Sequence, residues 1–139
     1  MPDLNQYVVF TNFAGEVMAK IFKDVSAGTQ WISFFKYDSN GRLILAANPS
    51  AVSGYDETKP DLLNNQAGNY QYLRDADGLI EVTTFYTSTT ATSTIAGGVA
   101  GFRQKTELQR GETGTAIKQD QVDYFTRSAF GGTFAITAN

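Results

Sequence analysis

Two short stretches, residues 38–41 and 75–78, place oxygen-bearing side chains at alternate positions before a glycine. The side chains are those of Asp38, Asn40, Asp75 and Asp77. Calcium takes about six to eight oxygen ligands, so carboxylates and amides in this pattern could contribute to a calcium site. Neither stretch has a later glutamate at the spacing of a complete calcium loop. A β-turn explains the same residues without an ion. The pattern therefore favours turns, with calcium as the weaker alternative.

Catalysis by paired carboxylates is the other chemistry that these residues suggest. Glycoside hydrolases use two Asp or Glu side chains held at a fixed separation. Asp75 and Asp77 are too close in sequence to be interpreted in that way. The chain contains no histidine and no cysteine, which removes the commonest general base, thiol nucleophiles, disulfides and the usual structural zinc sites. We therefore expect no enzyme and no cofactor, and a hydrolase with carboxylates from distant segments is the third hypothesis.

Length and composition indicate one globular domain over residues 1–139. Aromatic residues make up 13% of the chain, which favours strands over helices. The net charge of −3 argues against nucleic acid, which needs a basic surface, and against anionic lipid. No apolar run is long enough to span a bilayer, so no membrane insertion is expected. The first residues lack a basic region followed by an apolar run, so the sequence predicts no signal peptide.

The elements that would position these side chains are hairpins centred on glycines. Five places align on one glycine each, near residues 7–22, 33–47, 70–86, 103–117 and 123–138. The aligned glycines, which would supply the positive φ that other residues avoid, are Gly15, Gly41, Gly78, Gly111 and Gly131. Turn-forming residues stand three positions earlier in four copies, at Asn12, Asp38, Asp75 and Ser128. We predict a mainly β fold of successive antiparallel hairpins that form a twisted, curled or stacked sheet.

Two inserted loops, residues 48–69 and 87–101, interrupt the hairpins. Residues 59–63 could make a short helical turn in the first loop, with Pro60 at an early helix position. The second loop is rich in Ser, Thr, Ala and Gly, and is either a surface loop or an edge strand with a polar face. A short helix near residues 13–22 competes with the first hairpin.

Aromatic side chains on the predicted strands have two possible roles. They can pair across the sheet and fill the core, or they can stay exposed and stack on a sugar or a partner protein. We expect Trp31, Tyr37 and Tyr72 to pack the sheet. Phe34 and Phe35 are adjacent, so they must point to opposite faces. One of them is therefore exposed, or is covered by a second layer or by another chain.

The stretches "YDSNGRL" (residues 37–43) and "YQYLRDADGLI" (residues 70–80) resemble the YD repeat of RHS-type proteins. In that repeat an aromatic residue precedes Asp, two variable residues, Gly, often Arg, and an apolar strand. The first stretch matches at Tyr37, Asp38, Gly41 and Arg42. The second departs from the pattern, with Arg74 in place of the aromatic residue and Leu79 in place of the arginine.

The resemblance implies hairpin repeats that coil into a long sheet, which can close into a shell, and a location outside the cell or on its surface. It leads to a first hypothesis of a non-enzymatic structural module. Such a module would self-assemble through open sheet edges, or join neighbouring repeats of a larger shell, surface fibre or filament. The alternative is a monomeric β-domain that binds a glycan or a partner protein through exposed aromatics.

Overall fold

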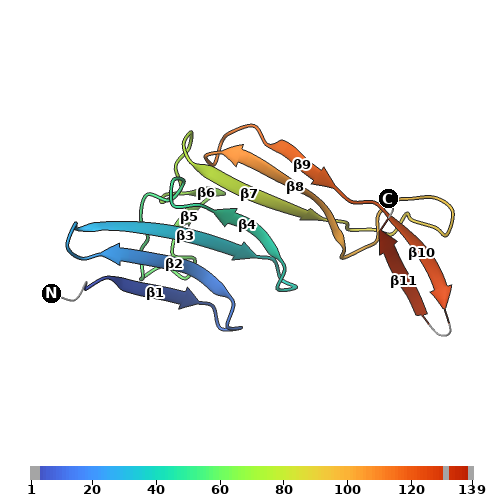
Figure 1. Cartoon of the computed structure of the whole chain (residues 1–139), viewed down its shortest axis with the longest axis horizontal. Helices are drawn as coiled ribbons and strands as arrows, with labels where there is room; N and C mark the ends of the chain where they lie inside the picture. The colour runs from blue at the N-terminus through green and yellow to red at the C-terminus, as the bar shows by residue number, and fades with distance from the viewer. Residues whose placement is uncertain (1–3, 130–131, 138–139) are drawn as a thin grey trace. The chain divides into compact units, whose positions relative to one another are not determined.

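The computed structural model describes residues 4–129 and 132–137, and the chain is mainly β (Figure 1). Seven strands form one antiparallel sheet in the order β1-β2-β3-β4-β7-β8-β9. Their bounds are β1 Gln6–Thr11, β2 Val17–Asp24, β3 Thr29–Tyr37, β4 Leu43–Ala47, β7 Leu79–Phe85, β8 Arg103–Arg110 and β9 Ile117–Gln121. Two small hairpins pair β5 (Asn65–Gln66) with β6 (Asn69–Tyr70), and β10 (Tyr124–Ala129) with β11 (Gly132–Thr137). Across these described ranges there is no helix, and hence none that could cross a membrane.

The chain divides into two compact units. Unit 1 comprises Met1–Val82 and Leu108–Ala116, and unit 2 comprises Thr83–Glu107 and Ile117–Asn139. Strands β7 and β8 each run through both units. Unit 1 contains the first two predicted hairpins, β1–β2 and β3–β4, both antiparallel. The competing helix near residues 13–22 is not formed, because these residues make a turn and most of β2.

The first hairpin turns at Asn12, whose side chain organises the loop. Asn12 Oδ1 accepts hydrogen bonds from the backbone N–H groups of Ala14 and Glu16, both at 3.0 Å. Asn12 Nδ2 donates to Glu16 Oε2 at 2.6 Å. Gly15 has a φ of +82°, and its N–H donates to the Asn12 carbonyl at 3.0 Å. This is a three-residue hairpin loop in which glycine supplies the left-handed conformation.

The second hairpin turns at Asp38 with the same backbone pattern. Asp38 Oδ1 accepts from the N–H groups of Asn40 at 2.9 Å and Arg42 at 3.0 Å. Gly41 has a φ of +74° and donates to the Asp38 carbonyl at 3.0 Å. Arg42 donates to Asp38 Oδ2 through Nε at 2.7 Å and through Nη2 at 2.6 Å. An Asp–Arg ion pair thus occupies the place that an Asn–Glu hydrogen bond takes in the first turn.

The expected third hairpin, residues 70–86, is wrong. β7 pairs with β4 instead, with Ala46 opposite Glu81. The segment before the turn bridges back to the first inserted loop, where Leu73 lies opposite Val52. The physical reason is that β4 has an unpaired edge once the second hairpin is closed, and β7 takes that edge. Residues 48–78, which connect β4 to β7, are called the insert below.

The insert covers one face of the sheet and completes the core of unit 1 (Figure 1). The sheet contributes alternate residues of its strands, which all point to this side. The buried cluster consists of Ile21, Ile32, Phe34, Ala47 and Ile80 from the sheet, and Ala51, Val52, Leu63 and Leu73 from the insert. A second layer is therefore present, and it is made by an inserted loop that the sequence did not identify as a core element.

The helical turn expected at residues 59–63 is also wrong, since these residues form consecutive non-helical turns. Leu62 has a φ of +59°, which a right-handed helix cannot contain. Asp61 accepts hydrogen bonds from the N–H groups of Asn64 at 3.0 Å and Asn65 at 2.6 Å. Such side-chain bonds offer the backbone an alternative to the helix. They direct the chain so that Leu63 is fully buried.

The fourth and fifth predicted hairpins, near residues 103–117 and 123–138, coincide with the strands β8 to β11. Gly111 follows β8 with a φ of +68°, and β9 is the next strand. β10 and β11 pair antiparallel up to Ala129 and Gly132, while Gly131 lies outside the described residues. Residues 87–101 contain no named strand. Within this loop Thr90 Oγ1 accepts from the Gly98 N–H at 2.9 Å.

Candidate functional site

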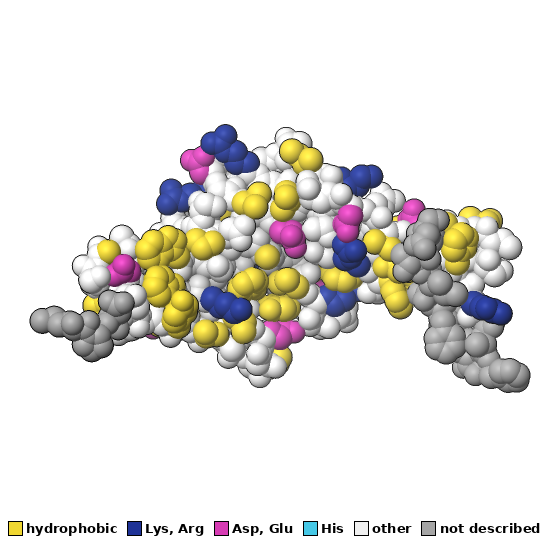
Figure 2. Space-filling model, viewed as in Figure 1, with side chains coloured by type: hydrophobic (Ala, Val, Ile, Leu, Met, Phe, Trp, Pro, Cys, Tyr) yellow, Lys and Arg dark blue, Asp and Glu magenta, His cyan; other side chains and the backbone are white. Residues whose placement is uncertain are grey.

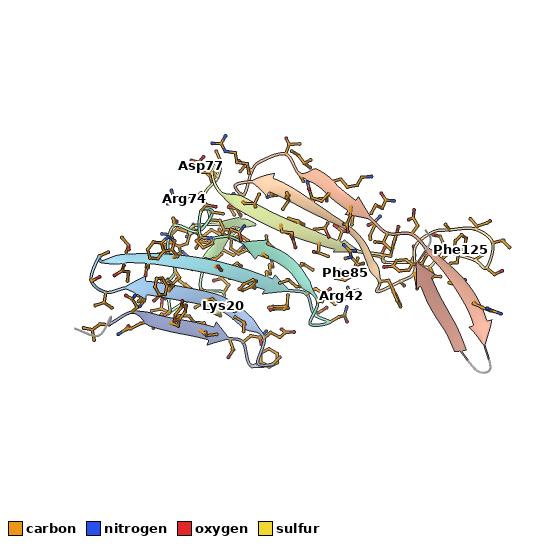
Figure 3. All side chains as sticks on the ribbon, viewed as in Figure 1. Lys20, Arg42, Arg74, Asp77, Phe85 and Phe125 are labelled. Carbon is orange, nitrogen blue, oxygen red and sulfur yellow. The ribbon has the colours of Figure 1, made fainter. Side chains whose placement is uncertain are left out.

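The sheet face opposite the insert carries a set of apolar side chains, here called the open face. Residues directly opposite each other on antiparallel strands share a face, and this places the following residues together. The open face consists of Tyr7, Val9, Lys20, Phe22, Trp31, Ser33, Phe35, Ala46 and Glu81. Tyr7 is 81% exposed, Val9 53% and Trp31 47%. Figure 2 shows apolar side chains gathered on this face, around the lysine that Figure 3 labels as Lys20.

Three aromatic rings form a row across the open face. Tyr7 lies opposite Phe22, and Phe22 lies opposite Trp31, on three neighbouring strands. The ring centroids of Tyr7 and Phe22 are 4.9 Å apart, and those of Phe22 and Trp31 are 5.5 Å apart. Each such contact stabilises the sheet by about 0.5–1.5 kcal/mol beyond area burial. The row holds β1 to β3 together and still leaves much of Tyr7 and Trp31 accessible.

The open face carries one cation and one anion. Lys20 is on β2, and its Nζ lies 5.6 Å from the centroid of the Phe35 ring. Glu81 is on β7, opposite Ala46. Both side chains are exposed, and neither belongs to an ion pair among the described residues. A partner on this face would therefore meet a mostly apolar surface with two charges of opposite sign.

The same unit has an unprotected sheet edge at β1. The strand reads QYVVFT and contains no charged residue, no proline and no glycine. Natural edge strands usually carry lysine, proline or a mid-strand bulge, which prevents pairing with another chain. The one irregularity of β1 lies at its end, between Phe10 and Thr11. Its outer N–H and C=O groups are therefore available for another strand.

Two of the four calcium candidates, Asp38 and Asp77, have carboxylate oxygens bonded to other groups. Both carboxylate oxygens of Asp38 are bonded within its turn, and the hydrogen bond from Arg42 holds the pKa of Asp38 below its ordinary value. Asp77 Oδ1 accepts from Arg110 Nη2 at 2.6 Å. The carbonyl of Asp75 accepts from the N–H and hydroxyl of Thr113 at 3.0 and 2.8 Å. No group of three or more acidic side chains converges in the described ranges 4–129 and 132–137.

The aromatic residues expected to pack the sheet divide between its two faces. Phe34 is buried and Phe35 is half-buried on the other side, as their adjacency requires. Tyr72 packs against the core from the insert. Tyr37 is half-buried at the end of β3. Trp31 belongs to the exposed row and not to the core.

Tyr7 and Phe22 are site residues that sequence reasoning missed. The turn at Asn12 brings β1 beside β2, and a bulge next to the turn sets the final register, in which Tyr7 lies opposite Phe22. Pairing the strands residue by residue from the turn outward would have set Tyr7 opposite Ile21, because the bulge between Phe10 and Thr11 shifts the register by one position. The contact depends on that bulge, which the turn residues do not predict.

Unit 2 contains a tyrosine with a strongly shifted pKa. Tyr86 Oη donates a hydrogen bond to Asp123 Oδ1 at 2.5 Å. This bond favours the neutral phenol and raises the pKa of Tyr86 to about 12. The Tyr86 ring also lies edge-on to Tyr124, with centroids 6.3 Å apart. The arrangement fixes the Tyr86 side chain and keeps its proton at neutral pH.

No protein-family model, curated protein or solved structure matches this chain. The functional interpretation therefore rests on the open face and on the edge at β1.

Proposed function

We propose that the chain is a non-enzymatic structural module that acts by strand pairing at β1. The partner strand comes from a second copy, or from a neighbouring repeat of a larger shell, surface fibre or filament. The observation that carries the proposal is the edge strand itself, which is uncharged and rich in residues that favour strands. An edge of this kind is a template for adding another strand.

The backbone of β1 can form hydrogen bonds on its outer side. In an antiparallel sheet, residues alternate between those whose N–H and C=O groups point to one neighbour and those whose groups point to the other. About half of the six residues of β1 therefore direct their polar groups away from β2. Each backbone hydrogen bond made there contributes roughly 0.5–1.5 kcal/mol net. Three or more of them, with the side-chain contacts that accompany pairing, are enough to select a partner strand.

The finer part of the proposal is that the first two hairpins are copies of one repeat of the RHS YD type. It is supported by the "YDSNGRL" stretch and by the shared hydrogen-bond pattern of the turns at Asn12 and Asp38. Repeats of this kind cover their apolar faces with their neighbours. An extracellular or cell-surface location belongs to the same proposal.

The test is amide hydrogen exchange at single-residue resolution, on dilute and concentrated samples whose assembly state is followed by light scattering and electron microscopy. In the monomer we expect alternate protection along β1, because only the amides that face β2 are bonded. In the assembled state the outward amides become protected as well. β3 is the internal control, since both of its edges are already paired. A chain that stays monomeric throughout, or an assembly in which the outward β1 amides still exchange freely, would refute the proposal.

A further inference from the structure

We infer that the open face is a two-fold interface with a second copy of this chain, in which Lys20 of each copy meets Glu81 of the other. This contact is separate from strand pairing at β1, because it uses the face of the sheet and not its edge.

The open face exposes apolar side chains to water. Tyr7, Val9 and Trp31 keep about half or more of their surface in water. A depression of about 250 Å³ lies among the residues of the row and is bordered by Pro49. Contiguous exposed apolar surface of this kind usually marks an interaction site. Burying it removes apolar area from water, which is the main favourable term in association.

The two charges lie on strands that are symmetrically placed in the sheet. In the sheet order β2-β3-β4-β7, the strands β2 and β7 are equally far from the boundary between β3 and β4. A two-fold axis along that boundary exchanges the positions of β2 and β7 between facing copies. The cation of each copy then lies over the anion of the other, at both ends of the contact. A two-fold interface requires this self-complementarity.

Lys20 and Glu81 do not lie at the same level along the strands. Glu81 belongs to the cross-strand line of Phe35 and Ala46, whereas Lys20 lies opposite Ser33, two residues away along β3. Two strand residues correspond to about 7 Å. Lys20 bridges part of this offset, because its Nζ lies over the ring of Phe35. The lysine head thus leans toward the level at which Glu81 is found.

The size of the face sets the expected strength. With the axis between β3 and β4, the strands β2, β3, β4 and β7 of the two copies cover one another. Four strands at a spacing of about 4.8 Å, over about 17 Å of strand length, give roughly 330 Å² for each copy. Both copies together bury roughly 650 Å² of flat area, below the roughly 1,600 Å² of a standard interface. The pairing is therefore a weak one, with a dissociation constant in the micromolar range or above. A weak contact suits a module whose copies are held close together by other means, because local concentration then favours it.

The occupant that competes with a second copy is a glycan stacked on the aromatic row. A sugar needs a flat aromatic platform, but the ring planes of Tyr7 and Phe22 are inclined by 45° and those of Phe22 and Trp31 by 32°. The opposite charges of Lys20 and Glu81 also have no role in stacking a neutral sugar. Both features favour the second copy.

The experiment reverses the charges one at a time in the full chain and measures self-association by sedimentation over micromolar to millimolar concentrations. Lys20→Glu and Glu81→Lys each replace two attractive contacts per dimer by two repulsive ones. We expect each to weaken pairing roughly tenfold. The controls are Lys118→Glu and Glu57→Lys, which make the same changes in net charge at exposed positions outside the open face. The controls should leave the association constant within about twofold of the original chain.

Mixing the two variants tests directly whether residues 20 and 81 meet across the interface. In a mixed pair of Lys20→Glu and Glu81→Lys chains, opposite charges meet at both contacts, so the mixture should associate about as well as the original chain. Failure of the mixture to recover, or equal effects of the reversals and their controls, overturns the inference. So does a chain that stays monomeric while a β-linked glucose oligomer changes the fluorescence of Trp31. Because neither reversal changes a residue of β1, amide exchange at β1 reports separately on the proposed strand pairing.

Discussion

Replacing glycine by alanine in three turns separates the free-energy cost of a backbone conformation from the cost of a close contact. Gly15, Gly41 and Gly78 have φ values of +82°, +74° and +83°. Their surroundings differ, because a Cβ at Gly15 would meet nothing within 4 Å. A Cβ at Gly41 would lie 2.6 Å from Glu16 Oε1, and one at Gly78 would overlap the backbone N of Ala51.

The magnitudes follow from these three environments. Left-handed φ costs an alanine about 1–2 kcal/mol, and Gly15→Ala should lower the free energy of unfolding by that amount. Gly41→Ala should cost about 2–3 kcal/mol, since Glu16 can swing away but gives up its hydrogen bond to Asn12. At Gly78 the obstacle is backbone of the buried insert, and overpacking adds about 1–3 kcal/mol. Gly78→Ala should therefore cost about 2–5 kcal/mol, the largest loss of the three.

The assay is urea unfolding followed by far-UV circular dichroism and by the fluorescence of Trp31, the single tryptophan of the chain. The order of midpoints should be Gly15→Ala above Gly41→Ala above Gly78→Ala, with unchanged slopes. A Gly78→Ala chain that fails to fold still meets the expectation if the other two differ as stated. Equal losses at all three positions would show that the close contacts carry no cost. A Gly15→Ala variant as stable as the original chain would show that the left-handed φ costs an alanine nothing at this position.

Two further predictions concern titratable groups. Asp38→Asn should keep the turn, as Asn12 does in the first hairpin, but lose the ion pair with Arg42. Because the pKa of Asp38 lies below its ordinary value of 3.8, its contribution is present above that pH and is lost as the pH falls below it. Urea unfolding of the variant should therefore depend less on pH below about 4 than that of the original chain. Asp123→Asn should lower the pKa of Tyr86 from about 12 toward 10.0 in an ultraviolet titration. In the original chain the raised pKa contributes stability below pH 10.0, which is lost as the pH rises toward 12, and an unchanged titration would contradict the assigned cause.

The local turns could be predicted from the sequence because their information is local. Asn12 and Asp38 stand three residues before glycine, and their side-chain oxygens accept the backbone N–H groups that the turn leaves free. The alternation of Phe34 and Phe35 between faces follows in the same way from the two-residue period of a strand. In each case the residues that determine the structure are within a few positions of one another.

The outcome for the third predicted hairpin could not be foreseen in this way, because its turn residues contact distant segments and not each other. Asp75 and Gly78 match the register, yet the carbonyl of Asp75 bonds Thr113 and Gly78 lies against Ala51. β7 pairs with β4, which is distant in the sequence, and no pattern within residues 70–86 predicts that pairing. The core of the insert was missed for the same reason. Leu63 and Val52 look like loop residues until the sheet that they cover is present.

The edge and the open face together determine what kind of assembly the chain would build. Pairing of β1 with β1 of a second copy is a two-fold contact that closes on itself, and so is pairing through the open face. The axis of the first contact lies at the edge of β1 and the axis of the second lies at the boundary between β3 and β4, so the two axes do not meet and the two contacts do not close together. Their combination extends into a linear array, in which the edge lengthens the sheet and the face stacks two sheets. Lys20→Glu should then stop growth at the edge-paired dimer, which is a sharper outcome than a general loss of association. Large closed particles formed equally by Lys20→Glu and by the original chain would exclude this geometry.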